Sequence, residues 1–119
     1  MLDTFVEQYL VNPKKVTSPQ MTIAFQTTEL GRKHLFAGVH PADGTARAQI
    51  LSHEHNPSLY SFIEEYARMT GMGGLLNTSF NTHGYPIVRT SEDAYDVLKT
   101  TELDGLWLDG ALIMKNQNA

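Results

Sequence analysis

The chain has 119 residues, a length typical of one domain, so residues 1–119 are expected to fold as a single domain. The hydrophobic fraction of 41% and the charged fraction of 18% are typical of a folded protein and argue against disorder. Cysteine is absent, which excludes disulfides, zinc–thiolate sites and cysteine nucleophiles and is compatible with a cytoplasmic location. A net charge of −4 with 9 Lys and Arg argues against a nucleic-acid partner. No signal peptide and no apolar stretch of the roughly 20 residues that span a membrane is recognisable.

The first half of the chain is expected to contain one short helix followed by strands. Residues 3–10 show helical spacing of apolar side chains, and Asp3 suits the N-terminal cap. Alternation of apolar and polar residues then predicts strands, separated by turns. The strands are expected at residues 21–26, 35–40 and 45–51, and the turns at residues 30–33 and 41–44.

Residues 57–70 form the clearest predicted helix. Asn56 can cap it, Pro57 suits its first turn, and Gly71 can end it in the left-handed conformation. Its core-facing stripe is expected to be Leu59, Phe62, Ile63, Tyr66 and Met69. The glycine-rich residues 71–74 are expected to be a flexible connection.

The last third is expected to alternate between strands and one more helix. Residues 74–78 suggest a buried strand and residues 79–86 an irregular loop, after which Ser91 opens a helix with a core side of Ala94, Val97, Leu98 and Thr101. Strands at residues 103–108 and 111–114 are expected around an Asp109-Gly110 turn, with a frayed tail at residues 116–119. The whole pattern predicts an α+β domain in which helices cover one face of a mixed sheet.

A row of polar side chains is expected on the strand that follows Asp43-Gly44. Thr45, Arg47 and Gln49 would share one side of it, because side chains alternate along a strand. A hydroxyl, a guanidinium and an amide in a row can hold phosphate or carboxylate oxygens. The same row is also compatible with the solvent-facing side of an edge strand.

A second polar cluster follows the predicted strand at residues 74–78. Asn77, Thr78, Ser79 and Asn81 could orient phosphate oxygens or a carbamoyl amide, or they could cap a turn through local hydrogen bonds. Gly84 would permit close backbone approach to a ligand, and Arg89 is either a further anion contact or a surface charge.

Metal chemistry and serine or phosphate-loop chemistry find little support in the residue pattern. His53 and His55 could share a strand face, but no third ligand stands at a suitable spacing, so no metal site is predicted. Ser79 lacks a Gly-x-Ser-x-Gly elbow, and no Gly-x-x-x-x-Gly-Lys-Ser/Thr loop occurs. His40 and His83 lie beside the two polar clusters and suit ligand contact better than metal binding, whereas His34 has no evident partner.

Several spaced motifs, taken together and in order, resemble the C-terminal region of the O-carbamoyltransferases that act in nodulation and antibiotic tailoring. The similar region covers residues 18–108, and Asn-Thr-Ser-Phe-Asn at residues 77–81 is its strongest motif. The remaining motifs are Ser18-Pro19-Gln20-Met21, His40 with residues 43–49, Asn56-Pro57, Thr70-Gly71, Gly84 with Pro86-Ile87-Val88, and Ser91-Glu92-Asp93-Ala94.

The resemblance implies a YrdC-like fold and a specific reaction. Such domains make carbamoyl-adenylate from carbamoyl phosphate and ATP, with Mg²⁺ bridging the phosphates, and an N-terminal ATPase-like domain that holds iron passes the carbamoyl group to a substrate hydroxyl. By position, Arg47 matches a phosphate- or nucleotide-contacting arginine, and Ser79 and Asn81 match residues of the adenylate site. Thr45, Asn77, Thr78 and Gly84 would support binding. Catalytic roles are therefore expected for Arg47, Ser79 and Asn81.

The chain also departs from the family pattern. Tyr85 replaces the usual glutamate before Pro86, and an extra residue separates His40 from Asp43. The upstream cationic segments of the family are not found, so the chain is expected to be truncated on its N-terminal side and to bind ATP weakly or not at all. The alternatives are a non-catalytic interaction module, a separately encoded subunit that docks onto an ATPase-like partner, or a family relic. An uncovered apolar face would predict self-association into a homo-oligomer.

Overall fold

The computed structural model describes residues 1–115, which form two compact units, one spanning Met1–Leu76 and one starting at Asn77. Over these residues, four α-helices and two small antiparallel sheets make an α+β structure, as the sequence predicts. The expectation of one mixed sheet is wrong, because the two sheets belong to different units. Two compact units are compatible with one domain or two, so the single-domain assignment of residues 1–119 stays a prediction.

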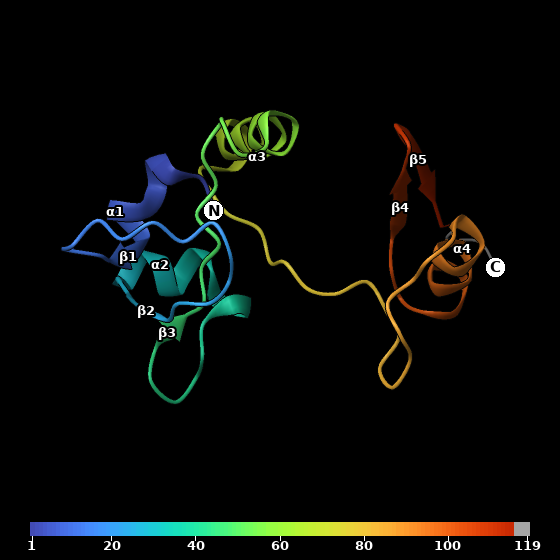
Figure 1. Ribbon diagram of the computed structural model, residues 1–119, viewed down its shortest axis with the longest axis horizontal. Helices are drawn as coiled ribbons and strands as arrows, with labels where there is room; N and C mark the ends of the chain where they lie inside the picture. The colour runs from blue at the N-terminus through green and yellow to red at the C-terminus, as the bar shows by residue number, and fades with distance from the viewer. Residues whose placement is uncertain (116–119) are drawn as a thin grey trace. The chain divides into compact units, whose positions relative to one another are not determined.

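The first unit contains a three-stranded sheet with the order β1-β2-β3 (Figure 1). The strands are β1 (Leu10–Val11), β2 (Phe25–Thr27) and β3 (Thr45–Ala46), and both pairings are antiparallel. A 3-10 helix at Asp3–Phe5 and the helix α1 (Val6–Tyr9) precede the sheet. The predicted N-terminal helix is therefore confirmed, although it ends one residue early because Leu10 pairs with Thr27. The expected cap is wrong, because Asp3 lies inside the 3-10 helix and no side chain caps either helix.

The strands of this sheet are shorter than the alternation of side chains predicts. The strand expected at residues 21–26 begins only at Phe25, because the amide of Thr22 closes a turn on the carbonyl of Gln20. The strand expected at residues 45–51 ends at Ala46. Beyond it the chain binds the loop at Ser18, whose hydroxyl donates to the carbonyl of Ala48 at 2.8 Å. Side-chain alternation thus continues where strand pairing has already stopped.

The turn predicted at residues 30–33 and the strand predicted at residues 35–40 are both wrong. Helix α2 occupies Glu29–His34, and a 3-10 helix follows at Phe36–Gly38. Helix α2 begins because the Thr28 hydroxyl accepts from the amide of Gly31 at 2.9 Å, which caps its first turn. The segment after it closes on itself, since the amide of Gly38 donates to the carbonyl of Leu35.

Helix α3 (Pro57–Thr70) has the predicted bounds and caps, but it buries a different face. The Asn56 side chain accepts from the amide of Leu59 at 3.0 Å, and Gly71 ends the helix at φ +76°. Tyr60 and Ile63 are the buried residues of the helix. Of the predicted stripe, Leu59, Phe62 and Met69 are exposed and Tyr66 is half-buried, so only Ile63 was assigned correctly to the core.

The core of the first unit consists of two clusters of buried side chains, and Phe5 packs against both. One cluster is centred on Leu2, Leu51, Tyr60 and Ile63, and the other on Tyr9, Leu10, Phe25 and Ala48. Gly73 is buried, and a Cβ at this position would lie 2.2 Å from the Phe5 ring. The predicted flexible connection at residues 71–74 is therefore wrong in its second half. The buried strand predicted at residues 74–78 is also wrong, because these residues have no strand pairing and Leu76 is exposed.

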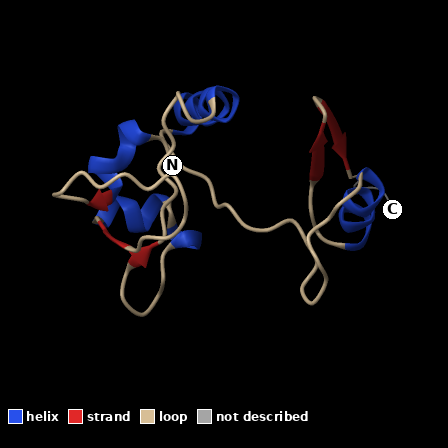
Figure 2. Ribbon diagram, viewed as in Figure 1, coloured by secondary structure: helices blue, strands red, loops and turns tan. Residues whose placement is uncertain are grey.

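The second unit consists of a loop, the helix α4 (Ser91–Thr100) and a hairpin of β4 (Gly105–Leu108) and β5 (Ala111–Met114) (Figure 2). Ala94, Leu98 and Leu106 form its core, and Val97 and Thr101 are half-buried, which confirms the predicted core side of the helix. The hairpin turn at Asp109-Gly110 is confirmed, and β4 begins two residues later than predicted. The tail predicted at residues 116–119 lies outside the described residues. None of the helices described here is sufficiently long and apolar to span a membrane.

Candidate functional site

Arg47 is the exposed cation of the polar row that the sequence predicts. It follows β3 directly and lies between the buried Ala46 and Ala48, so its side chain points to solvent. Within residues 1–115 its guanidinium has no hydrogen-bond or ion-pair partner. The other two members are engaged, because the Thr45 hydroxyl donates to Asp43 at 2.8 Å and the Gln49 amide donates to the carbonyl of Pro19 at 3.1 Å. Arg47 is therefore the member that is available for an anion.

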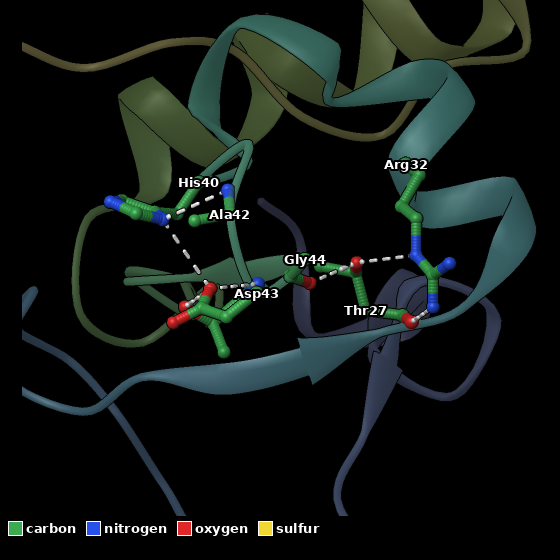
Figure 3. A network of polar contacts seen from close by, with 7 residues as sticks. Thr27, Arg32, His40, Ala42, Asp43 and Gly44 are labelled. Carbon is green, nitrogen blue, oxygen red and sulfur yellow. Dashed lines mark hydrogen bonds and ion pairs between the residues drawn. The ribbon is translucent and has the colours of Figure 1, made fainter.

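The turn before β3 is held by its own acidic residue (Figure 3). The Asp43 carboxylate oxygen Oδ1 accepts from the amide of Thr45 at 2.9 Å and from its hydroxyl at 2.8 Å. These hydrogen bonds lower the pKa of Asp43 below its ordinary value of 3.8, because they stabilise the ionised form. His40 lies on the other side of the carboxylate, with Nδ1 3.6 Å from Oδ1. Gly44 adopts φ +68°, which suits a residue without a Cβ.

A second set of contacts holds the same turn from β2 and α2, as Figure 3 shows. The buried Thr27 donates from its hydroxyl to the carbonyl of Gly44 at 2.6 Å, and its amide donates to the same oxygen at 3.2 Å. Arg32 in turn donates from Nε to the Thr27 hydroxyl at 3.3 Å and from Nη2 to the Thr27 carbonyl at 3.1 Å. Sequence reasoning missed both residues. The available signal was a helix start at Thr28-Glu29 with basic residues three to five positions later, which places Arg32 on a helix.

The predicted amide and hydroxyl cluster belongs to the second unit, where its members bind one another. The Ser79 hydroxyl donates to Asn81 Oδ1 at 2.7 Å, and the half-buried Asn81 donates from Nδ2 to the carbonyl of Tyr85 at 2.9 Å. Asn77 and Thr78 are exposed. These local hydrogen bonds agree with the turn-capping interpretation of Ser79 and Asn81. They leave exposed surface on the cluster for a ligand.

Gly84 is needed for its backbone conformation. It adopts φ +84°, and no atom lies within 4 Å of the place where a Cβ would stand. Arg89 lies before α4, where its amide donates to the Asp93 carboxylate at 3.1 Å and its charge helps to lower the pKa of Asp93. Thr45 and Arg47 belong to the first unit, and Asn77 to Gly84 belong to the second. That these two groups serve one nucleotide stays a prediction.

His34, His53 and His55 are engaged in separate contacts. His34 lies 2.8 Å from the hydroxyl of the buried Tyr9, which supplies the partner that the sequence did not reveal. His53 packs edge-on against the ring of Tyr60, and His55 Nδ1 lies 2.5 Å from the Ser52 hydroxyl. Over residues 1–115, no group of three or more His, Asp or Glu side chains is placed to hold a metal ion.

A shallow hollow of about 320 Å³ lies beside α1 and β1 in the first unit. Val6, Leu10 and Val11 form its apolar part, and Lys15 lies at its edge. None of the predicted site residues lines it. The hollow therefore contributes nothing to the site around Arg47.

Comparison with known proteins assigns the chain to a family. A family model described as "Carbamoyltransferase C-terminus" matches residues 1–115. Nodulation protein NolO of Bradyrhizobium diazoefficiens is 38% identical over 97 residues, which are 82% of this chain and 18% of that protein. Nodulation protein U of Rhizobium tropici is 32% identical over 101 residues, or 85% of this chain and 17% of that protein. The protein MJ1051 of Methanocaldococcus jannaschii is 36% identical over 115 residues, or 97% of this chain and 22% of that protein.

The chain thus spans about a fifth of the length of these relatives. The match of the family model covers every described residue, and it agrees with the resemblance seen in the motifs from Ser18 to Leu108. The chain is similar to nodulation proteins of the NolO and NodU type. It belongs to the carbamoyltransferase C-terminal domain family.

Proposed function

We propose that this chain acts as the C-terminal domain of an O-carbamoyltransferase and contributes to the formation of carbamoyl-adenylate from carbamoyl phosphate and ATP. The carbamoyl group would then pass to a hydroxyl on a substrate bound by an N-terminal ATPase-like domain or subunit, where iron would also be held. Family membership supports this proposal. The observation that carries it for this chain is the exposed Arg47, which has no partner among the described residues and lies three residues after Gly44 in a turn held by hydrogen bonds on both sides.

The proposed roles follow the chemistry of each side chain. Arg47 binds phosphate oxygens, since a guanidinium can donate two parallel hydrogen bonds to one phosphate. Ser79 and Asn81 are proposed to contact the adenylate, and Asn77 and Thr78 to support them with exposed polar groups. Thr45 and Gly84 shape the backbone beside these residues. We further propose a YrdC-like fold and a cytoplasmic location, which suit a cysteine-free chain that uses ATP.

The reaction needs charge stabilisation more than covalent help from the protein. Water would displace inorganic phosphate from carbamoyl phosphate, and the carbamate so formed would attack the α-phosphate of ATP. This attack places charge on phosphoryl oxygens and on the leaving pyrophosphate. Mg²⁺ would bridge the phosphates when ATP is bound. A fixed donor aimed at the developing charge lowers the barrier, and removing one such donor from the oxyanion hole of a protease costs about 3–4 kcal/mol. Arg47 is the group proposed to supply that stabilisation from the first unit.

A titration by NMR tests the proposal on the chain itself. Backbone amide shifts are followed while Mg²⁺–ATP, and separately carbamoyl phosphate, is added to millimolar concentration. We expect weak saturable binding, with shifts around residues 44–48 that are lost in Arg47→Ala. Arg68→Ala is the matched control, because Arg68 is an exposed arginine of the same unit that pairs with Glu65 on α3. Equal binding by wild type and Arg47→Ala would refute the role of Arg47. A dissociation constant of the wild-type chain in the micromolar range would refute the expectation that the chain binds ATP weakly.

A second candidate function is a docking role without catalysis, as an interaction module or a separately encoded subunit. The exposure of apolar side chains favours it. In the first unit Leu59 and Met69 are exposed on α3, and in the second Leu112 and Met114 are exposed on β5. Apolar surface of this kind is typical of a face that binds another protein. It predicts self-association when the partner is missing.

Light scattering after size-exclusion chromatography over a range of concentrations tests this second candidate. We expect a rise in mean mass with concentration that is reduced in Leu59→Ser/Met69→Ser. The control is Lys14→Ser/Lys15→Ser, which changes two exposed residues of a loop. A chain that stays monomeric at the highest concentration would count against docking through these faces.

A further inference from the structure

The Gly44 carbonyl joins the turn before β3 to Thr27 of β2. It accepts from both the hydroxyl and the amide of Thr27, at 2.6 and 3.2 Å. Thr27 is 2% exposed, so its hydroxyl makes these contacts away from water. A hydrogen bond that is shielded from water is electrostatically stronger than one at the surface. The buried threonine therefore fixes the turn to β2.

Arg32 fixes Thr27 itself. Its Nε donates to the Thr27 hydroxyl and its Nη2 to the Thr27 carbonyl, at 3.3 and 3.1 Å. Two donors held in one plane set both the distance and the angle between α2 and β2, which a lysine cannot do with a single ammonium group. The Nε atom also stands 3.5 Å from the position of a Cβ at Gly44, so the guanidinium lies directly beside the turn.

The fixed turn leads directly to Arg47. Asp43 holds the amide and hydroxyl of Thr45 from the outer side, while Thr27 holds Gly44 from the inner side. The residues that follow alternate between buried Ala46, exposed Arg47 and buried Ala48. The position of the Arg47 backbone is therefore set by contacts of the turn and by the burial of its two neighbours.

We propose that Thr27 and Arg32 are positioning residues that hold the segment from Asp43 to Arg47 so that Arg47 can bind phosphate. This inference rests on the proposed function. Arg32 acts through Thr27 and Gly44, not by touching the phosphate. Arg32 as a whole is an exposed residue outside both core clusters, so its substitution removes no core side chain.

Arg32→Lys separates positioning from direct charge attraction. Lysine keeps the positive charge and the helix, but it loses the simultaneous contacts to the hydroxyl and the carbonyl of Thr27. Positioning predicts that Arg32→Lys binds Mg²⁺–ATP about three- to tenfold more weakly than wild type, as expected for the loss of one or two hydrogen bonds. Direct attraction predicts that Arg32→Lys binds as wild type does. Lys33→Ala, on the next position of the same helix, is the control for removal of one charge.

Thr27→Ser and Thr27→Val form the second pair of variants. Serine keeps the hydroxyl that donates to Gly44, so we expect binding within about twofold of wild type. Valine has nearly the same shape but leaves the Gly44 carbonyl without that donor, so we expect weaker binding and a lower urea midpoint. Affinity is measured by NMR under conditions in which each variant is folded, and the urea midpoint is measured in parallel. Weaker binding by Arg32→Lys at an unchanged urea midpoint would show an effect beyond general stability.

Amide exchange supplies a readout that needs no ligand. The amides of Thr27 and Gly44, which donate to the carbonyls of Gly44 and His40, should exchange faster in Arg32→Lys than in Lys33→Ala. Arg32→Lys with wild-type affinity and exchange, beside a weakened Arg47→Ala, would overturn the inference and leave the proposed function intact. Wild-type affinity in Arg47→Ala would instead overturn both.

Discussion

The amide of Gly73 donates a hydrogen bond to the hydroxyl of Tyr9 across 3.0 Å in the interior of the first unit. Tyr9 is fully buried, and its hydroxyl also lies 2.8 Å from Nδ1 of His34. One hydroxyl thus joins the chain after α3 to α1 and α2. The two residues are 64 positions apart in the sequence, so this contact is among those that give the first unit its tertiary structure.

Tyr9→Phe should destabilise the first unit. The buried amide of Gly73 and the ring of His34 would both lose their partner, and an unsatisfied buried donor costs about 1–3 kcal/mol. Urea unfolding measures the change. The control is Tyr85→Phe, which removes a hydroxyl from an exposed tyrosine and should leave the midpoint unchanged. An unaltered midpoint for Tyr9→Phe would mean that water replaces the hydroxyl.

Gly31→Ala should destabilise the chain although alanine favours helices. An added Cβ would lie 2.2 Å from the carbonyl oxygen of Tyr9, which belongs to the backbone and cannot move cheaply. Propensity alone would stabilise α2 by about 1 kcal/mol, so the sign of the change separates the two effects. We expect a loss of about 1–3 kcal/mol from overpacking. The control is Gly38→Ala, where the nearest atom to a Cβ lies 3.6 Å away.

The start of α4 should weaken in acid. The Asp93 carboxylate accepts from the amides of Arg89 and Thr90, and these hydrogen bonds lower the pKa of Asp93 below its ordinary value of 3.8. Because the folded-state pKa is depressed, this contribution to stability is present above about pH 4 and is lost as the pH falls through the folded-state pKa. Amide exchange at Ala94, which donates to the carbonyl of Thr90, measures the loss.

Two variants define this acid effect. The exchange of Ala94 is expressed as a protection factor, the rate in the unfolded chain divided by the observed rate at the same pH, because amide exchange itself depends on pH. Asp93→Asn should remove the dependence of this protection factor on pH below about pH 4, since no group titrates at that position. Thr90→Ala removes the reciprocal hydrogen bond of the capping box and should cost about 1 kcal/mol at neutral pH. A dependence on pH that persists in Asp93→Asn would assign the effect to another carboxylate.

Gly110→Val should disrupt the hairpin of the second unit. Asp109 and Gly110 adopt φ +50° and +81°, the pair of positive values that a two-residue hairpin turn requires. A β-branched residue at Gly110 is strained there, and we expect a cost of about 1–3 kcal/mol. Emission of Trp107, the single tryptophan of the chain, reports on β4. Asp109→Asn should fold normally, because asparagine tolerates this conformation.

The predicted elements were confirmed where caps and turn residues in the local sequence define them. Asn56, Pro57 and Gly71 defined α3 to the residue, and Asp109-Gly110 defined the hairpin. Prediction failed at α2, where a turn was expected, and at residues 35–40, where a strand was expected but the chain makes a 3-10 helix. A strand needs a neighbour to accept its hydrogen bonds, and the pattern of side chains does not reveal whether such a neighbour exists.

In the candidate site, too, local sequence signals revealed one residue and long-range contacts hid two others. Arg47 was identified from the Asp-Gly turn and the alternation after it, and it is exposed. Thr27 and Arg32 were missed because their contacts reach Gly44, which lies 17 and 12 positions away. A threonine at position 27 and an arginine at position 32 do not by themselves indicate a contact with Gly44.

The family, helices α3 and α4 and the hairpin could be predicted from the sequence, because spaced motifs, caps and turn residues act within a few positions along the chain. Long-range packing settled that Tyr60 instead of Phe62 faces the core, that Gly73 packs against Phe5, and that Thr27 holds Gly44. These outcomes depend on which distant surfaces meet, and close packing selects among faces that local periodicity leaves nearly equivalent.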